Sequence, residues 1–185
     1  MKMLSKSLSA FALAGVITSA SAATVVNQSI SEAEVIGAQK AWCQALIDIS
    51  STYAKDGQPA AKALAEKVID SAYGYQMGAV LFKPTLTVAP QTFRTTREGA
   101  LAYFVGGNSD YPQDKGFALK GWTKCEPQNA GVFIAGDSAT SMGNVMMTNK
   151  DGQVTTVDKT WTYVKDDAGN LRIVVHHSSL PYTGK

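Results

Sequence analysis

The sequence predicts an α+β domain in which a curved antiparallel sheet wraps around about three N-terminal helices and forms a cone with a pocket. Segments with helical periodicity occupy the first part of the chain, and strand-like segments separated by turn sequences occupy the rest. Helices followed by a run of strands are typical of α+β domains. The 185 residues contain no internal repeat, so we expect one domain at 31–182, with an arm at 23–30 and a tail at 183–185.

Residues 1–22 have the features of a secretory signal peptide. A basic start with Lys2 and Lys6 precedes a short apolar stretch and the small residues Ala20, Ser21 and Ala22. The apolar stretch is too short to form a stable membrane anchor, and no later stretch is long enough to span a bilayer. We therefore expect cleavage near Ala22 and a periplasmic or secreted bacterial product with no membrane partner.

The charge balance argues against a nucleic-acid partner. The chain has 17 basic and 15 acidic residues, and the leader holds two of the basic ones and none of the acidic ones. The remaining chain is therefore neutral, and its basic residues are scattered. Nucleic-acid binders need a clustered positive field, so we expect no such partner.

Three helices are predicted before the sheet. The first begins at Ser31, because Glu34 three residues later completes a capping-box pattern. A turn sequence ends it, and Pro59 suits the first turn of the second helix. Thr95 begins the third helix. The predicted inner faces consist of Trp42, Leu46, Ile49 and Tyr53 in the first helix and Leu64, Val68 and Ala72 in the second.

The remaining segments are predicted as strands. "AVLFKPTLTVAP" contains strand pieces interrupted at Pro84. The turn sequences "NKDGQ" and "DDAGN" later in the chain indicate antiparallel hairpins. Five strand-like segments follow Gly116, at 117–126, 131–136, 139–149, 154–165 and 171–179.

The chain has two cysteines, Cys43 and Cys125, which lie 82 positions apart. A lone pair in an oxidising compartment is a disulfide candidate, and two separate buried thiols are the alternative. The cysteines lack the paired spacing of zinc ligands. We therefore expect no metal and no cofactor.

The stretch "RIVVHHSSLPY" holds the only two histidines of the chain, His176 and His177. Side chains alternate along a strand, so the two histidines point to opposite sides of the sheet and cannot bind one metal together. A histidine in the pocket is a candidate general acid or base, and a hydrogen-bonded structural histidine is the alternative. Strict alternation groups Arg172, Val174, His176 and Ser178 on one face, and Leu171, Ile173, Val175, His177 and Ser179 on the other.

The segments "LFKPT", "FRTTREGALAYFVGG", "DKGFAL" and "VDKTWTYVKDDAGNLRIVVHHSSLPY" resemble exported bacterial proteins related to the association domain of calcium/calmodulin-dependent protein kinase II. That group belongs to the nuclear transport factor 2-like superfamily, which has the cystatin-like cone fold. The resemblance covers 31–182 and implies a deep pocket and a homo-oligomer, a dimer or larger, formed through the sheet. It implies no single reaction. It favours His176 and Ser178 on the pocket side, while the aliphatic neighbours of His177 keep that residue a candidate.

The resemblance implies that pocket arginines of the kinase's association domain correspond to positions near Trp161 and Ser178, which are not basic here. Lys159 shares the strand face of Trp161 and would supply a charge instead. Asp114, in the loop before the sheet, is a candidate to orient His176 or to act as a base. The full set of candidate ligand-binding residues is Lys83, Arg94, Tyr103, Lys159, Trp161, Tyr163, His176, His177, Ser178 and Tyr182.

Two functions from different classes fit these observations. The favoured one is a non-catalytic binding module, an oligomer whose pocket binds a small, partly apolar molecule. The mixture of aromatic and polar candidates and the absence of a recognisable catalytic motif favour it. The alternative is an enzyme of the isomerase, cyclase or lyase type, in which His176 acts as acid or base with help from Asp114. An assembly protein with a vestigial pocket is a third possibility.

Overall fold

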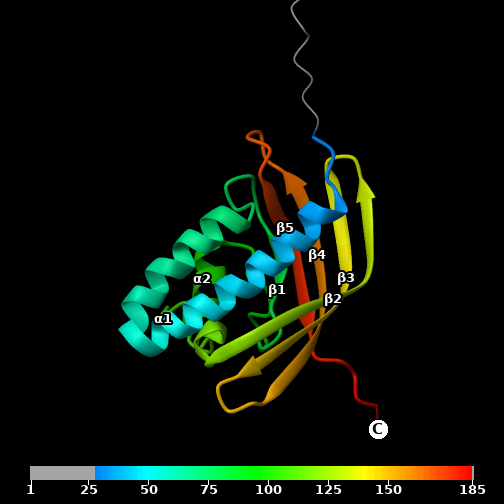
Figure 1. The fold of residues 1–185 in the computed structure, drawn as a ribbon. Coiled ribbons are helices and arrows are strands. Elements are labelled where there is room, and N and C mark those ends of the chain that lie inside the picture. Colours follow the sequence, from blue (N-terminus) through cyan, green and yellow to red (C-terminus); the bar gives the residue numbers. More distant parts are fainter. Residues whose placement is uncertain (1–27, 185) are drawn as a thin grey trace, which may run out of the picture.

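Helices cover one face of a five-stranded sheet, so the fold has two layers (Figure 1). This is a computed structural model, and it describes residues 28–184. The predicted signal peptide, most of the predicted arm and Lys185 lie outside the described residues. In chain order the elements are α1 (Glu32–Ala72), β1 (Leu81–Lys83), α2 (Arg97–Val105), the 3-10 helix η1 (Phe117–Leu119), β2 (Trp122–Ala135), β3 (Ser138–Asn149), β4 (Val154–Lys165) and β5 (Leu171–Ser179).

The strands lie in the order β1-β5-β4-β3-β2. The strands from β2 to β5 form an antiparallel meander, which confirms the α+β fold class. The edge strand β1 differs from the prediction because it runs parallel to β5. The reason is that the chain leaves α1 at Tyr73, already beside Ile173, and continues along β5 in the same direction.

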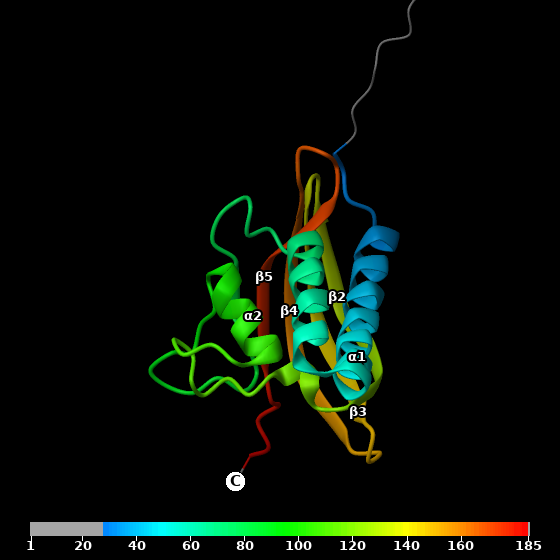
Figure 2. The same cartoon turned by 90° about the vertical axis from the view of Figure 1, so that its left-hand side faces the viewer.

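The helix predictions hold with small shifts. The Ser31–Glu34 capping box is present, because the Ser31 hydroxyl accepts from the Glu34 amide and the Glu34 carboxylate accepts from the Ser31 amide. Gly57, with a φ of 81°, kinks α1 into two legs that lie side by side (Figure 2). Pro59 lies just after this kink, as predicted. The cap of α2 is Thr96, one residue later than the predicted Thr95.

The strands β3, β4 and β5 occupy the predicted segments, whereas β2 differs. The predicted segments 117–126 and 131–136 combine into one strand, and the first residues of the former make η1. A β-bulge between Asn129 and Gly131 lies opposite Gly143 and keeps β2 paired with β3 along its length. The bulge brings the backbone very close to Gly143, because a Cβ there would lie 2.1 Å from the Gln128 carbonyl oxygen.

Cys43 and Cys125 form a disulfide that joins the first leg of α1 to β2, with an S–S distance of 1.99 Å. The hydrophobic core lies between the sheet and the two helices. Over residues 28–184, no helix is long and apolar enough to cross a membrane.

Candidate functional site

A small cavity lies between the inner face of the sheet and the helices. Its free volume is about 10 Å³, roughly the space that one water molecule requires. It is therefore far smaller than a pocket for a drug-sized ligand and suits only a very small molecule. Its walls are the aromatic residues Trp42, Phe82, Tyr103, Phe104 and Phe117, together with Pro84 and the polar residues Thr85, Lys159, His176 and Ser178.

A β-bulge in β5 sets which side chains reach this cavity. Thr162 pairs with Val175 and Tyr163 pairs with Ile173, so Val174 is the extra residue of the bulge. The predicted strict alternation along β5 is therefore wrong before the bulge. Ile173, His176 and Ser178 all face the core, while His177 is exposed on the outer face of the sheet.

His176 is buried and held by hydrogen bonds on both ring nitrogens. Nδ1 lies 2.9 Å from the Tyr73 hydroxyl, and Nε2 lies 2.9 Å from Lys159 Nζ. The Phe82 ring stacks on the imidazole with 4.4 Å between centroids. Burial is the main cause that lowers the pKa of His176 well below its usual 6.5, with smaller effects from the neighbouring Lys159 and His177 side chains, so the ring is neutral.

The first leg of α1 extends this hydrogen-bonded group. Trp42 Nε1 donates to the Tyr73 hydroxyl over 2.9 Å. Tyr73 has no exposed surface, and burial raises the pKa of its hydroxyl, which stays protonated. The group therefore runs from Trp42 through Tyr73 and His176 to Lys159 and connects α1, β5 and β4.

Lys159 brings a buried amine to the cavity. Its side chain is only 4% exposed, and Nζ lies 4.7 Å from the centroid of the Trp42 ring and 5.5 Å from that of Trp161. Burial lowers the pKa of Lys159 from its usual 10.5 to about 7. Within the described part of the chain, no acidic residue lines the cavity to counter the charge.

Three hydroxyl groups complete the polar wall. Thr85 Oγ1 and Ser178 Oγ lie 2.6 Å apart, and Lys83 Nζ donates to the Ser178 carbonyl oxygen over 3.2 Å. The Tyr103 hydroxyl lies beside Thr85 and Leu86, yet it has no hydrogen bond of normal geometry within residues 28–184. Burying an unsatisfied hydroxyl is costly, so Tyr103 has an unused donor that a ligand in the cavity would satisfy.

Arg94 and Asp114 form a site of their own. Two hydrogen bonds of 2.8 Å join the Arg94 guanidinium to the Asp114 carboxylate, and both side chains are buried. Neither residue lines the cavity around His176. The expectation that Asp114 orients His176 is therefore not met, because both oxygens of the Asp114 carboxylate accept hydrogen bonds from Arg94. This ion pair connects the loop before η1 to the segment before α2.

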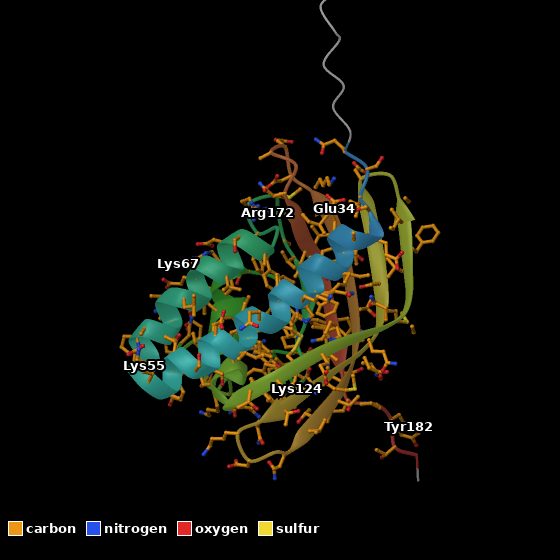
Figure 3. The ribbon with its side chains drawn as sticks, viewed as in Figure 1. Glu34, Lys55, Lys67, Lys124, Arg172 and Tyr182 are labelled. Carbon is orange, nitrogen blue, oxygen red and sulfur yellow. A yellow bond between two sulfur atoms is a disulfide. The ribbon has the colours of Figure 1, made fainter. Side chains whose placement is uncertain are left out.

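The other predicted residues have different locations. Trp161 is buried beside His176, with ring centroids 5.6 Å apart. Tyr163 is buried too, but it lines a separate apolar hollow between β4, β5 and α1. The exposed His177 does not face the cavity, and Tyr182 is 91% exposed. Figure 3 shows Tyr182 on the C-terminal tail, pointing away from the helices and the sheet.

Sequence reasoning missed Tyr73, Phe82, Thr85 and the role of Trp42. The predicted inner face of the second leg of α1, with Leu64, Val68 and Ala72, is rotated from the observed one. The fully buried residues are Ala61, Ala65, Ile69 and Tyr73. Tyr73 follows Ile69 at helical spacing, and this is the pattern by which it could have been found.

Fold and site together define a class of protein: a cone-shaped α+β domain with a small buried pocket of hydroxyl, imidazole and amine groups. In residues 28–184, no three His, Cys, Asp or Glu side chains are grouped to hold a metal ion.

The sequence profile "MICAH: Metal-independent carbonic anhydrase" matches residues 33–180. A protein of Nostoc sp. (strain PCC 7120 / SAG 25.82 / UTEX 2576) named metal-independent carbonic anhydrase is 62% identical over 165 residues, which cover 89% of this chain and 80% of that protein. The chain belongs to the metal-independent carbonic anhydrase family.

Solved structures agree with this assignment. The crystal structure of a cyanobacterial iota-carbonic anhydrase in complex with bicarbonate has a TM-score of 0.86 and 62% identity, and the match covers 88% of this chain and 99% of that one. A protein from Xanthomonas campestris, assigned to the calcium/calmodulin-dependent protein kinase II association domain, has a TM-score of 0.53 and 21% identity, covering 91% and 100%. The predicted resemblance to association domains thus holds for the fold.

The family assignment corrects the functional prediction. The favoured binding module without an established reaction is wrong, as is the preference for a non-enzyme, because a relative with 62% identity is a carbonic anhydrase. The error has a physical origin. The polar groups of this cavity come from β4, β5, α2 and the segment after β1, and only His176 and Ser178 share one strand. Their chemistry therefore matched no catalytic motif that the sequence analysis tested.

Proposed function

We propose that this chain is a carbonic anhydrase that interconverts carbon dioxide and bicarbonate in the cavity around His176. The observation that carries the proposal is the small buried cavity, in which three hydroxyls, a neutral imidazole and an amine face aromatic walls. The family assignment and the bicarbonate complex of the cyanobacterial relative support it.

The polar wall suits a planar anion with three oxygens. Thr85, Tyr103 and Ser178 bring hydroxyl groups to the cavity, and Tyr103 has a donor to spare. The Lys159 amine adds a charge that responds to pH near neutrality. Bicarbonate would accept hydrogen bonds from the hydroxyls, while the aromatic rings would hold apolar carbon dioxide and exclude excess water.

The reaction requires few changes in bonding. The oxygen of a water molecule bonds to the carbon of carbon dioxide, one C=O electron pair moves to its oxygen, and the water gives up a proton. In this proposal the hydroxyls of the polar wall donate hydrogen bonds to the oxygen that becomes negative. Groups placed in advance where charge develops stabilise a transition state more than its reactants.

The direct test is stopped-flow carbon dioxide hydration by the purified full chain after treatment with a metal chelator. We expect hydration above the buffer rate, and at least a tenfold loss in Ser178→Ala. Ser179→Ala is the matched control, because Ser179 lies next along β5 and does not line the cavity. A wild-type rate equal to that of buffer alone would overturn the proposal.

We also propose that the chain acts in the periplasm or after secretion from a bacterium. The leader-like residues 1–22 support this, and the disulfide suits an oxidising compartment. Cell fractionation tests it: processed protein with an N-terminus near Ala23 in the periplasm is expected, and unprocessed protein in the cytoplasm would contradict it.

We propose, finally, that the chain forms a homo-oligomer through the outer face of its sheet. Phe133 and Met142, at 73% and 61% exposure, place apolar side chains on that face. Light scattering during gel filtration tests this. We expect a dimer or larger species that Met142→Lys dissociates, and a wild-type monomer at micromolar concentration would exclude it.

A further inference from the structure

We propose that Lys159 is the proton acceptor of the hydration step, and that Trp42, Tyr73 and His176 hold its amine uncharged until the proton arrives. This inference rests on the proposed function and assigns the group that completes it. Lys159 lines the cavity and is therefore placed to touch the reacting molecules. Tyr73 does not line the cavity, and the Trp42 ring forms part of its apolar wall. Both act on Lys159 through His176 and are therefore positioning residues.

The argument begins with the direction of the hydrogen bonds. An indole nitrogen can only donate, so Trp42 Nε1 gives its hydrogen to the Tyr73 oxygen. The hydroxyl hydrogen of Tyr73 then needs an acceptor of its own. Within residues 28–184 the remaining polar partner of this hydroxyl is His176 Nδ1, at 2.9 Å. Nδ1 therefore accepts.

The same logic fixes the state of the other ring nitrogen. A neutral imidazole with an accepting Nδ1 carries its proton on Nε2. Nε2 lies 2.9 Å from Lys159 Nζ and points its hydrogen at the amine. An ammonium group has no lone pair to accept it. The lysine that fits this arrangement is the uncharged amine.

The reversed arrangement leaves a group unsatisfied. If an ammonium on Lys159 donated to Nε2, the ring proton would move to Nδ1 and would point at the Tyr73 oxygen. Tyr73 would then have two donors facing its oxygen and no acceptor for its own hydrogen. Because Tyr73 is fully buried, this unpaired hydroxyl hydrogen could not bond to bulk water instead.

The surroundings of the amine agree with this assignment. Lys159 is contacted by Trp42 from α1, Trp161 from β4 and His176 from β5, and Tyr103 from α2 lines the same cavity. Asp158, the neighbouring acid in the chain, faces the outer side and bonds to Asn144. Burial without a carboxylate partner lowers the pKa of Lys159 to about 7. The two indole rings favour the ammonium form by cation–π attraction, so the protonated state is within reach.

A base whose pKa lies near the working pH is well suited to proton transfer. Water oxygen bonds to the carbon of carbon dioxide, and one C=O pair becomes a lone pair on oxygen. The hydrogen bond from His176 Nε2–H to Nζ breaks, and the lone pair freed on Nζ takes the proton released by the water. The products are bicarbonate and the Lys159 ammonium, and no further reactant is required. After bicarbonate leaves, the ammonium returns its proton to water and His176 again donates to the amine.

The test combines one variant, one control and one direct titration. In Lys159→Met we expect carbon dioxide hydration to fall about 100-fold or more, as for the loss of a general base. Small primary amines added to the assay should restore part of the rate, which would not happen if the residue were only structural. Lys124→Met is the control, because Lys124 lies exposed on β2. NMR of the full chain labelled with ¹³C at lysine Cε should show one lysine titrating near pH 7, and this signal should be absent in Lys159→Met.

Each outcome has a separate meaning. A Lys159 signal that titrates near pH 10 with the other lysines would overturn the inference, as would a normal hydration rate in Lys159→Met. Either result would leave the proposed carbonic anhydrase activity intact if the wild type remains active. A wild type that does not hydrate carbon dioxide would overturn both proposals, and the titration would show independently whether the amine is uncharged.

Discussion

At the scale of single residues, Tyr103 and Tyr75 form a natural pair for comparison. Tyr103 lies in α2 and Tyr75 in the segment after α1, and both rings are largely buried. The Tyr75 hydroxyl donates to the Arg94 carbonyl oxygen over 2.9 Å, whereas the Tyr103 hydroxyl has no hydrogen-bond partner within residues 28–184. A hydroxyl with a partner contributes to stability, and a buried one without a partner reduces it. The two residues should therefore respond in opposite ways to loss of the hydroxyl.

We predict that Tyr103→Phe weakens bicarbonate binding by about 1 kcal/mol and leaves the free energy of unfolding unchanged or raised. Tyr75→Phe should lower the free energy of unfolding by a similar amount and leave bicarbonate affinity unchanged. Calorimetric titration with bicarbonate and urea unfolding measure the two quantities. Equal stability losses in both variants would show that the Tyr103 hydroxyl already has a partner in the protein.

Lys159 should impose a pH dependence on stability. Its pKa is about 7 in the folded chain against a usual 10.5, so between these values the unfolded chain binds more protons and stability rises with pH. The slope approaches about 1.4 kcal/mol per pH unit, and below pH 7 the cost of burying the amine is complete. Lys159→Met removes this cost. We expect the variant to be more stable than the wild type at pH 7, by an amount that shrinks toward pH 10.

Urea unfolding at several pH values measures this difference, with Lys124→Met as the exposed control. A stability difference between Lys159→Met and the wild type that does not change with pH would contradict the prediction.

At the scale of elements, β-bulges in β2 and β5 shape the sheet and the site. The bulge in β5 lets Ile173 and His176 face the core together, and the bulge in β2 presses its backbone against Gly143. The bounds of β3, β4 and β5 were predictable because alternation and turn sequences are local properties, whereas β1 and β2 differ from the predicted segments. The bulges were not, because an extra residue in one strand is decided by how its neighbours pack.

We predict that Gly143→Ala lowers the free energy of unfolding by about 2–3 kcal/mol, within the range of overpacked sites. The added Cβ would lie 2.1 Å from the Gln128 carbonyl oxygen, so the backbone of β2 has to shift. Gly131→Ala is the matched control, since a Cβ there meets nothing within 4 Å. Thermal unfolding of both variants measures the effect, and an equal small effect in the two would rule out the close approach.

At the scale of the whole molecule, the Cys43–Cys125 disulfide connects the helical layer to the sheet across 82 positions. A loop of this length restricts the unfolded chain, and we predict a loss of about 4 kcal/mol in the Cys43→Ser, Cys125→Ser double variant. Urea unfolding of the oxidised wild type, the reduced wild type and the double variant measures it. Reduction should reproduce the effect of the double substitution, and an unchanged midpoint would argue that the bridge does not form.

The arrangement of the whole molecule determines which residues of the candidate site could be predicted from the sequence. His176, Lys159 and Ser178 follow from strand alternation and the fold resemblance. Tyr73 and Trp42 do not, because their contacts with this group join positions up to 103 residues apart and depend on how α1 packs on the sheet. The assignment to an enzyme family was hidden for the same reason, since no single segment holds all the polar groups of the cavity.

The indole rings on either side of the Lys159 amine have a spectroscopic consequence. Trp42 and Trp161 are two of only three tryptophans in the chain, and both rings lie within 5.5 Å of the amine nitrogen, measured from their centroids. A charge appearing so close to an indole shifts its emission energy and alters its quenching. The intrinsic fluorescence of the unlabelled protein should therefore report the protonation state of the Lys159 amine in the cavity.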